Sequence, residues 1–203
     1  MARRVVLVRH ARIAAQLVGR LIGTTDVPLD AVGERQALAL RERAGRWAPD
    51  RCYTSPSRRC RQTTAAMFPG GDVAVDDDLR EIDFGRCEGL TFDESARDDP
   101  SFAASWAAME PDFAFPGGES LGDFLCRVHR TADCLARQEA TTVLAVTHKG
   151  VIRMMICHFL GLDPRQYVLF EVGYGAAATI ELFDGKGVLA SLEHLDLPEG
   201  DHG

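Results

Sequence analysis

The apolar positions of this chain fall into short continuous runs that alternate with longer amphipathic segments. Residues 5–8 and 143–147 are such runs and are rich in β-branched side chains, a pattern typical of strands buried on both faces. Apolar residues recur at helical spacing over residues 31–47 and 121–135. This alternation predicts an α/β fold, a three-layer αβα sandwich with a mostly parallel central sheet.

Turn and capping residues define the remaining elements. Ser55 and Pro56 are expected to start a helix that ends near residue 68. Residues 86–117, called the lid segment below, have no clear period and are expected to run irregularly over the surface. No repeat or linker interrupts the chain, so residues 1–203 are predicted to form one domain. The other predicted elements are strands at residues 52–54, 73–75, 176–183 and 188–192, the last two forming a hairpin, and a helix at 150–160.

The composition is that of a globular protein, with 46% hydrophobic and 26% charged residues among 203. The net charge of −7 argues against nucleic acid as a partner. No apolar run is long enough for a membrane span or a signal peptide, so we expect a cytoplasmic protein. The six cysteines form no Cys-x-x-Cys pair and no cluster with zinc-ligand spacing, and we therefore expect no metal site. The charge is uneven: residues 1–61 contain 13 Arg and 5 acidic residues, whereas residues 62–140 contain 6 Arg and 17 acidic residues.

Side chains suited to catalysis follow four of the predicted strands. Arg9 and His10 follow the first strand, Arg59 the second, Glu81 the third and His148 the fourth. Because ligands of open α/β sheets bind beyond the carboxyl ends of the strands, we expect these groups to converge on one site. A neutral imidazole can attack phosphorus, guanidinium groups can neutralise phosphoryl oxygens, and a carboxyl group can transfer the proton. The pattern predicts phosphoryl transfer.

Six segments resemble, in order, the motifs of the histidine phosphatase superfamily, which includes the cofactor-dependent phosphoglycerate mutases. Together they lie within residues 5–153, about three quarters of the chain. The resemblance implies a phosphoglycerate mutase-like fold. The segments are Arg9-His10 after the apolar strand, Gly19 to Leu29, Ser55 to Thr63, Leu79 to Gly85, Pro116 to Ser120, and Val146 to Arg153.

The same resemblance implies a role for each candidate catalytic residue. His10 would be the nucleophile that becomes phosphohistidine, and Glu81 would be the general acid and base. Arg9, Arg59 and His148 would hold the phosphoryl group. The resemblance also implies that no metal and no other cofactor takes part.

Three further positions are open to interpretation. Arg12 and Gly23 are candidates for binding the substrate, and Arg12 is placed to reach a second anionic group on it. Lys149 follows His148 where the superfamily commonly has Gly or Gln. This lysine either adds positive charge near the phosphate or points to water from the start of a helix.

The lid segment separates the candidate activities. Residues 87–126 contain one basic residue, Arg97, among a large excess of acidic residues, whereas mutases of the superfamily have extra basic residues in this stretch. Six aromatic residues fall between positions 84 and 115, which favours an apolar or aromatic leaving group with few further negative charges. The alternative is that these aromatic residues only anchor the lid to the core. They are Phe84, Phe92, Phe102, Trp106, Phe113 and Phe115.

A metal-independent phosphomonoester hydrolase acting on a small phosphorylated metabolite is the favoured interpretation. Within the superfamily the motifs are most similar to those of α-ribazole phosphatases, and residues 87–91 also resemble fructose-2,6-bisphosphatase domains. A cofactor-dependent phosphoglycerate mutase and a catalytically weak, regulatory phosphate-binding module are the alternatives. We expect no nucleic acid or membrane partner, with a homodimer as the candidate assembly. Residues 198–203 have the composition of a disordered tail.

Overall fold

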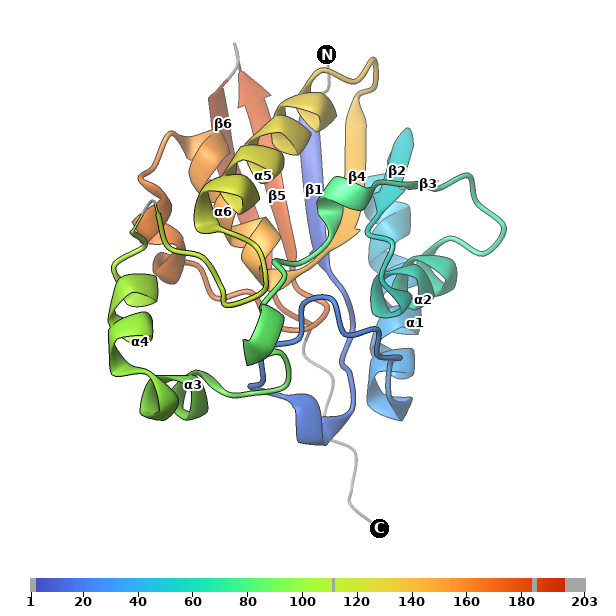
Figure 1. Ribbon diagram of the computed structural model, residues 1–203. Coiled ribbons are helices and arrows are strands. Elements are labelled where there is room, and N and C mark those ends of the chain that lie inside the picture. The colour runs from blue at the N-terminus through green and yellow to red at the C-terminus, as the bar shows by residue number, and fades with distance from the viewer. Residues whose placement is uncertain (1–2, 111, 184–185, 196–203) are drawn as a thin grey trace.

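Six strands form a single sheet with the order β3-β2-β4-β1-β5-β6 (Figure 1). The computed structural model describes residues 3–110, 112–183 and 186–195. Strands β1 to β4 are parallel to one another, whereas β5 and β6 form an antiparallel hairpin on the β1 side. The predicted mostly parallel sheet and its hairpin are therefore confirmed. The strands are β1 (Arg4–Arg9), β2 (Arg51–Thr54), β3 (Ala74–Val75), β4 (Thr142–Thr147), β5 (Ala177–Phe183) and β6 (Lys186–Glu193).

Helices cover both faces of the sheet, as Figure 1 shows. In β1, Val5 and Leu7 point into a core shared with α5 and α6, while Val6 and Val8 point into a core shared with α1 and α2. The alternation of side chains along a strand thus puts apolar groups on both faces, and the predicted three-layer sandwich is confirmed. The helices are α1 (Ala31–Trp47), α2 (Arg58–Met67), α3 (Phe92–Asp98), α4 (Pro100–Ala107), α5 (Leu121–Ala136) and α6 (Lys149–Leu160).

The start of α2 differs from the prediction. Ser57, not Ser55, is the N-cap residue, and the helix begins at Arg58. Ser55 is fully buried, and its hydroxyl lies 2.8 Å from Nε2 of His148. Its side chain therefore contacts His148 and does not cap the helix. By contrast, α1 spans residues 31–47 as predicted, with the Asp30 side chain accepting a hydrogen bond from the Gly33 amide.

The lid segment contains two helices, so its prediction as an irregular excursion is wrong. The first, α3, begins with a capping box in which Thr91 and Glu94 bind each other's backbone amides. The second, α4, is capped by the Asp99 carboxylate and has Pro100 in its first turn. Helices of seven and eight residues are too short to show a clear apolar period, and these caps are the signal that the sequence carries.

Two further expectations from the sequence concern membrane-spanning helices and residues 198–203. No helix in the described ranges is long and apolar enough to cross a bilayer. The predicted disordered tail, residues 198–203, lies outside the described residues.

The two segments that position the site are the ends of the central strands and the lid, which lies below those ends in Figure 1.

Candidate active site

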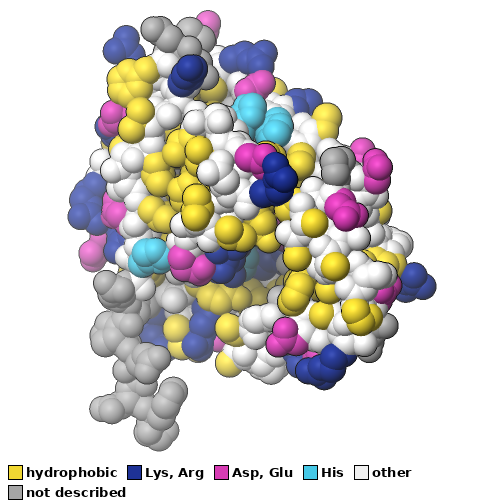
Figure 2. All heavy atoms as spheres, turned by 90° about the vertical axis from the view of Figure 1, so that its left-hand side faces the viewer, with side chains coloured by type: hydrophobic (Ala, Val, Ile, Leu, Met, Phe, Trp, Pro, Cys, Tyr) yellow, Lys and Arg dark blue, Asp and Glu magenta, His cyan; other side chains and the backbone are white. Residues whose placement is uncertain are grey.

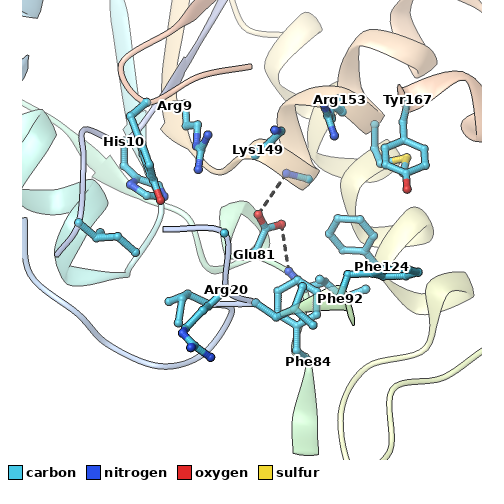
Figure 3. A pocket seen from close by; sticks show the side chains of 18 of the residues that line it. Arg9, His10, Arg20, Glu81, Phe84, Phe92, Phe124, Lys149, Arg153 and Tyr167 are labelled. Atoms are coloured by element: carbon cyan, nitrogen blue, oxygen red, sulfur yellow. Dashed lines mark hydrogen bonds between the residues drawn. The ribbon is translucent and has the colours of Figure 1, made fainter. Parts of the chain in front are cut away.

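A cavity of about 700 Å³ lies at the carboxyl ends of the parallel strands. Four of the predicted site residues line it: Arg9, His10, Arg59 and Glu81. Figure 3 shows Arg9 and His10 on one side, with Glu81 projecting between them and the aromatic side chains. The convergence expected from the strand ends is confirmed for these four side chains.

His10 follows β1 directly and is only 5% exposed. Its Nδ1 atom lies 2.9 Å from the carbonyl oxygen of Ala11. Because a carbonyl oxygen only accepts, Nδ1 carries the proton of the neutral ring and Nε2 keeps its lone pair. Burial lowers the pKa of His10 well below its usual value, and the positive charges of Arg9 and Arg59 lower it further. The ring is therefore neutral at physiological pH, the form in which it can act as a nucleophile.

Arg59 and His148 form a buried pair beside His10. The Arg59 guanidinium donates to the carbonyl oxygens of Thr25 and Gly23 at 2.9 and 2.8 Å, and one of its nitrogens lies 3.3 Å from Nδ1 of His148. Burial, followed by the charge of Arg59, lowers the pKa of His148 well below its usual value. The rings of His10 and His148 lie 5.2 Å apart, edge to face. His148 is thus behind the cavity wall, in contact with both His10 and Arg59.

The guanidinium group of Arg9 is fixed on the other side of His10. It donates to the carbonyl oxygen of Val172 at 2.8 Å and lies 3.8 Å from the centre of the Tyr174 ring. Burial lowers the pKa of Arg9 from its ordinary value. Within the described part of the chain, the Nε atoms of Arg9 and Arg59 are buried without a hydrogen-bond partner. Both guanidinium groups line the cavity with His10, so their positive charge can act on an anion bound there.

Glu81 brings a protonatable carboxyl group to the same cavity. Its oxygens accept hydrogen bonds from the amides of Gly150 and Ile82 at 3.1 and 3.2 Å, the dashed lines in Figure 3. Burial nevertheless raises the pKa of Glu81, which favours the protonated form that a general acid requires. A Cβ atom at position 150 would lie 2.5 Å from Oε1 of Glu81, so only glycine allows this approach.

The segment that carries Glu81 is held by an arginine that the sequence analysis missed. Arg127 of α5 is 4% exposed and donates to the carbonyl oxygens of Asp78, Arg80 and Glu81 at 2.7 to 3.0 Å. Both oxygens of the Glu119 carboxylate bind the same guanidinium, at 2.7 and 2.8 Å. A charged residue on the buried face of a strongly amphipathic helix was the available signal for Arg127.

The other end of the cavity is apolar. Four of the six aromatic residues counted in the lid region line it, namely Phe84, Phe92, Trp106 and Phe115, together with Phe124 of α5. Phe102 and Phe113 do not line it; their rings lie 4.9 Å apart and pack against the same cluster. Four of the six rings thus line the cavity and two pack against the core, and an apolar or aromatic leaving group stays a prediction.

Comparison with known proteins shows which family the chain belongs to. The model of the histidine phosphatase superfamily (branch 1) matches residues 5–194. The chain belongs to the histidine phosphatase superfamily. The bifunctional protein Rv2228c of Mycobacterium tuberculosis is 39% identical to it over 176 residues, 83% of this chain and 47% of that protein. The chain thus spans about half the length of this curated relative.

Two further members resemble the chain over nearly its whole length. Phosphoserine phosphatase 1 of Hydrogenobacter thermophilus is 28% identical over 192 residues, 93% of this chain and 91% of the relative. The crystal structure of the alpha-ribazole phosphatase from Shigella flexneri superposes with a TM-score of 0.83 at 24% identity, covering 93% of this chain and 95% of that one. The second likeness shows the superfamily fold.

Two of the predicted substrate-binding residues have other partners in this superfamily member. The Arg12 guanidinium forms an ion pair with Asp30, with nitrogen–oxygen distances of 3.0 and 2.9 Å, and Arg12 does not line the cavity. Asp30 thus occupies the Arg12 guanidinium in this structure, and binding of a second anionic group by Arg12 stays a prediction.

Gly23 supports the site without lining the cavity. Its amide donates to the carboxylate of Glu88 at 3.0 Å, and its carbonyl oxygen accepts from Arg59. Glu88 also binds the amides of Thr24 and Thr25, which fixes the loop that holds Arg59. The Gly23 amide is thus bound to Glu88 in this structure, and binding of phosphate by Gly23 itself stays a prediction. A Cβ atom at this position would lie 2.0 Å from the Ile82 carbonyl oxygen, so glycine is required by packing.

Metal ligands were not expected from the sequence. Across residues 3–110, 112–183 and 186–195, no three His, Cys, Asp or Glu side chains come together at a geometry that could hold a metal ion. That catalysis needs no metal stays a prediction, tested below.

Proposed function

We propose that this protein hydrolyses small phosphomonoesters through a phosphohistidine intermediate on His10. The observation that carries the proposal is the His10 ring itself: it is neutral, Nδ1 is held by the Ala11 carbonyl oxygen, and Nε2 is left with a lone pair beside Arg9 and Arg59. A nucleophile, two cations and a raised-pKa carboxyl group around one cavity suit transfer of a phosphoryl group.

In the first step Nε2 of His10 attacks phosphorus, and the bond between phosphorus and the ester oxygen breaks. Glu81 donates its proton to the departing oxygen, so that the product leaves as an alcohol or phenol. Arg9 and Arg59, which line the cavity with His10, neutralise the charge of the phosphoryl oxygens. The Ala11 carbonyl oxygen stabilises the positive charge that the ring acquires, since it accepts the Nδ1 proton.

In the second step the Glu81 carboxylate removes a proton from water. The oxygen of this water attacks phosphorus, the bond between phosphorus and Nε2 breaks, and inorganic phosphate is released. His10 and protonated Glu81 are regenerated, so the cycle is balanced without another reactant. The neutral His148 lies behind Arg59, where its Nδ1 accepts from the Arg59 guanidinium at 3.3 Å and its Nε2 lies 2.8 Å from the Ser55 hydroxyl, so its role in the cycle is to position Arg59.

The substrate we propose is a monophosphate with an apolar or aromatic body. The lid residues that line the cavity are apolar, three of them aromatic, and no basic residue of the lid segment lines it, which favours hydrolysis over the mutase reaction. Similar proteins carry the names phosphoserine phosphatase and alpha-ribazole phosphatase, so phosphoserine and α-ribazole phosphate belong in the substrate panel, with phosphoglycerates and fructose bisphosphate.

The test combines turnover with trapping of the intermediate. Purified protein should hydrolyse p-nitrophenyl phosphate in the presence of EDTA, and acid-labile, base-stable radiolabel should appear on His10 when a ³²P-labelled substrate is quenched early. His10→Ala should lose about 10⁴-fold or more in kcat/KM and all of the label, as loss of a catalytic nucleophile does. His129→Gln is the matched control and should keep both, because His129 stacks on His158 away from the cavity.

Four results contradict the proposal. Activity lost to EDTA contradicts a mechanism without metal, and label retained by the His10 variant contradicts this nucleophile. Interconversion of phosphoglycerates, primed by a bisphosphoglycerate and faster than hydrolysis, identifies a mutase. Binding of inorganic phosphate without turnover of any panel member identifies a regulatory phosphate-binding module.

A further inference from the structure

A second pair of cations lines the cavity beyond the phosphoryl site. Lys149 and Arg153 are the first and fifth residues of α6 and lie on the same side of the helix. Figure 3 shows them on the wall that continues from Arg9 toward Tyr167, and all four residues line the cavity. Neither cation is used in the mechanism described above.

A single carboxylate of the chain bridges these two cations. Glu171 lies 2.9 Å from Nζ of Lys149 and 3.0 Å from a guanidinium nitrogen of Arg153. Arg153 is fixed further by donation to the Phe170 carbonyl oxygen and by the Tyr167 ring, 5.7 Å away. The two cations are thus arranged so that one carboxylate can bind both.

Lys149 and Arg153 are part of the cavity wall, whereas the Glu171 carboxylate reaches them from the solvent side. The side chain of Glu171 is 66% exposed, compared with 33% for Lys149 and 15% for Arg153. On the face shown in Figure 2, basic and acidic side chains lie next to hydrophobic ones in a hollow of the lower half. An ion pair with so exposed a partner contributes little to stability, so Glu171 can turn into water at small cost.

The charge of this wall is not balanced by Glu171 alone. Arg9 acts electrostatically on both Lys149 and Glu171, which places it close to the pair. Arg9, Lys149 and Arg153 are positive and Glu171 is negative along this wall, while the raised pKa of Glu81, the other acidic residue that lines the cavity, favours its neutral form. Burial lowers the pKa of Lys149, which agrees with a cation that is partly removed from water before a ligand binds.

We propose that Lys149 and Arg153 form a second anion subsite that binds a carboxylate on the substrate, and that Glu171 occupies this subsite until the substrate displaces it. The proposal rests on the proposed function and narrows its substrate class to phosphomonoesters that carry a carboxylate on an apolar or aromatic body. A carboxylate is favoured over a second phosphoryl group because the group now bound there is a carboxylate with a single charge.

This subsite changes the expectation drawn from the lid segment. The acidic composition of the lid indicated a substrate with few further negative charges, but the cations come from α6, outside the lid. The sequence left open whether Lys149 adds charge to the site or points to water; the structure places it in the cavity wall.

The test measures binding without turnover, by calorimetry with non-hydrolysable phosphonates. Three probes differ only at the position opposite the phosphonate: (4-carboxybenzyl)phosphonate, its neutral carboxamide, and the bisphosphonate. Wild-type protein should bind the carboxylate about 10-fold more tightly than the carboxamide, as expected for hydrogen bonds to a charged group. In Lys149→Gln and Arg153→Gln this preference should fall to about 1 to 3-fold.

Glu171→Gln separates displacement from a simple electrostatic effect. Because this variant removes the internal competitor, it should increase the preference for the carboxylate by about 3 to 10-fold. Arg137→Gln is the matched control: its side chain is 71% exposed and pairs with Asp133, and the preference should not change. Comparable unfolding temperatures for all variants establish that they are folded.

Each outcome has one meaning. No preference for the carboxylate in the wild type, or a preference that survives Lys149→Gln and Arg153→Gln, overturns the subsite. Tighter binding of the bisphosphonate overturns the carboxylate assignment. Hydrolysis of p-nitrophenyl phosphate is measured alongside: carboxylate preference without hydrolysis overturns the proposed function alone, and hydrolysis without preference overturns the subsite alone.

Discussion

The two ends of the cavity are held by different kinds of contact. At the phosphoryl end, each charged side chain is fixed by directional hydrogen bonds to backbone groups, as Arg59 is by the carbonyl oxygens of Thr25 and Gly23 and Glu81 by two amides. At the lid end, the wall is a cluster of aromatic rings 4.9 to 6.4 Å apart, in which Trp106 contacts several others. Substitutions at the first end should therefore change the rate of the chemical step, and substitutions at the second should change affinity.

Glu81→Gln should give the largest effect after the nucleophile variant. The amide keeps the size of the side chain but can neither donate the proton nor activate water, so kcat should fall by about 10²–10⁴-fold. KM should change much less. The measurement is steady-state hydrolysis of an alkyl phosphate, whose leaving oxygen needs the proton. A kcat within a factor of about 3 of wild type excludes Glu81 as the general acid.

The pH profile follows from the two buried groups. Protonating His10 abolishes the nucleophile, and since its pKa is lowered, activity should persist well below the usual histidine range and decline only in acid. The general acid must be protonated, and since the pKa of Glu81 is raised, activity should decline as the pH rises through this raised value. The kcat/KM profile should be a bell, with its acid limb below the usual histidine range and its alkaline limb above the usual carboxyl range. Glu81→Gln should lose the alkaline limb, whereas His129→Gln should keep both limbs.

Arg127 should give an intermediate effect because it positions Glu81 without touching the substrate. Arg127→Lys keeps the charge but not the planar fork that binds three carbonyl groups and Glu119, so Glu81 should shift and kcat should fall by about 10 to 10²-fold, with KM nearly unchanged. Arg127→Gln should also raise the pKa of Glu81, because the charge of Arg127 lowers it. The alkaline limb should then move to higher pH.

Arg130→Gln is the matched control for this variant. Arg130 follows on the same helix and pairs with Asp78, but its side chain is 59% exposed. Its loss should leave kcat and the alkaline limb unchanged. A purely structural role for Arg127 would lower the unfolding temperature without moving that limb, and this result contradicts positioning.

The difference between the two ends also explains what the sequence could predict. His10 and His148 follow continuous apolar strands, and buried parallel strands place their ends at one edge of the sheet. The fold and four cavity-lining residues could therefore be predicted from spacing and resemblance. The ion pair of Arg12 with Asp30 could not be predicted, because Asp30 is the N-cap residue of α1 and the pairing depends on tertiary packing.

The lid was less predictable for a physical reason. Its helices are short, and their stability comes from caps and aromatic packing, not from a long apolar stripe. The contacts between aromatic rings are also weakly directional, so composition indicates an aromatic wall without telling which rings face the cavity. Phe92 of α3 lines the cavity and Phe102 of α4 does not, although both lie in the short helices of the lid.

Trp106→Leu should give the smallest effect and one confined to affinity. Trp106 lies 5.0 Å from Phe92 and 5.1 Å from Phe115, and the loss of such contacts weakens binding of an aromatic body, so KM for aryl phosphates should rise by about 3 to 10-fold. The kcat for the same substrates should stay within about 2-fold, because no hydrogen bond at the phosphoryl end changes. Phe183→Leu is the control, since Phe183 is 59% exposed and does not line the cavity. A fall in kcat comparable to that of Arg127→Lys would mean that the lid positions the reacting atoms, and that the two ends of the cavity are coupled.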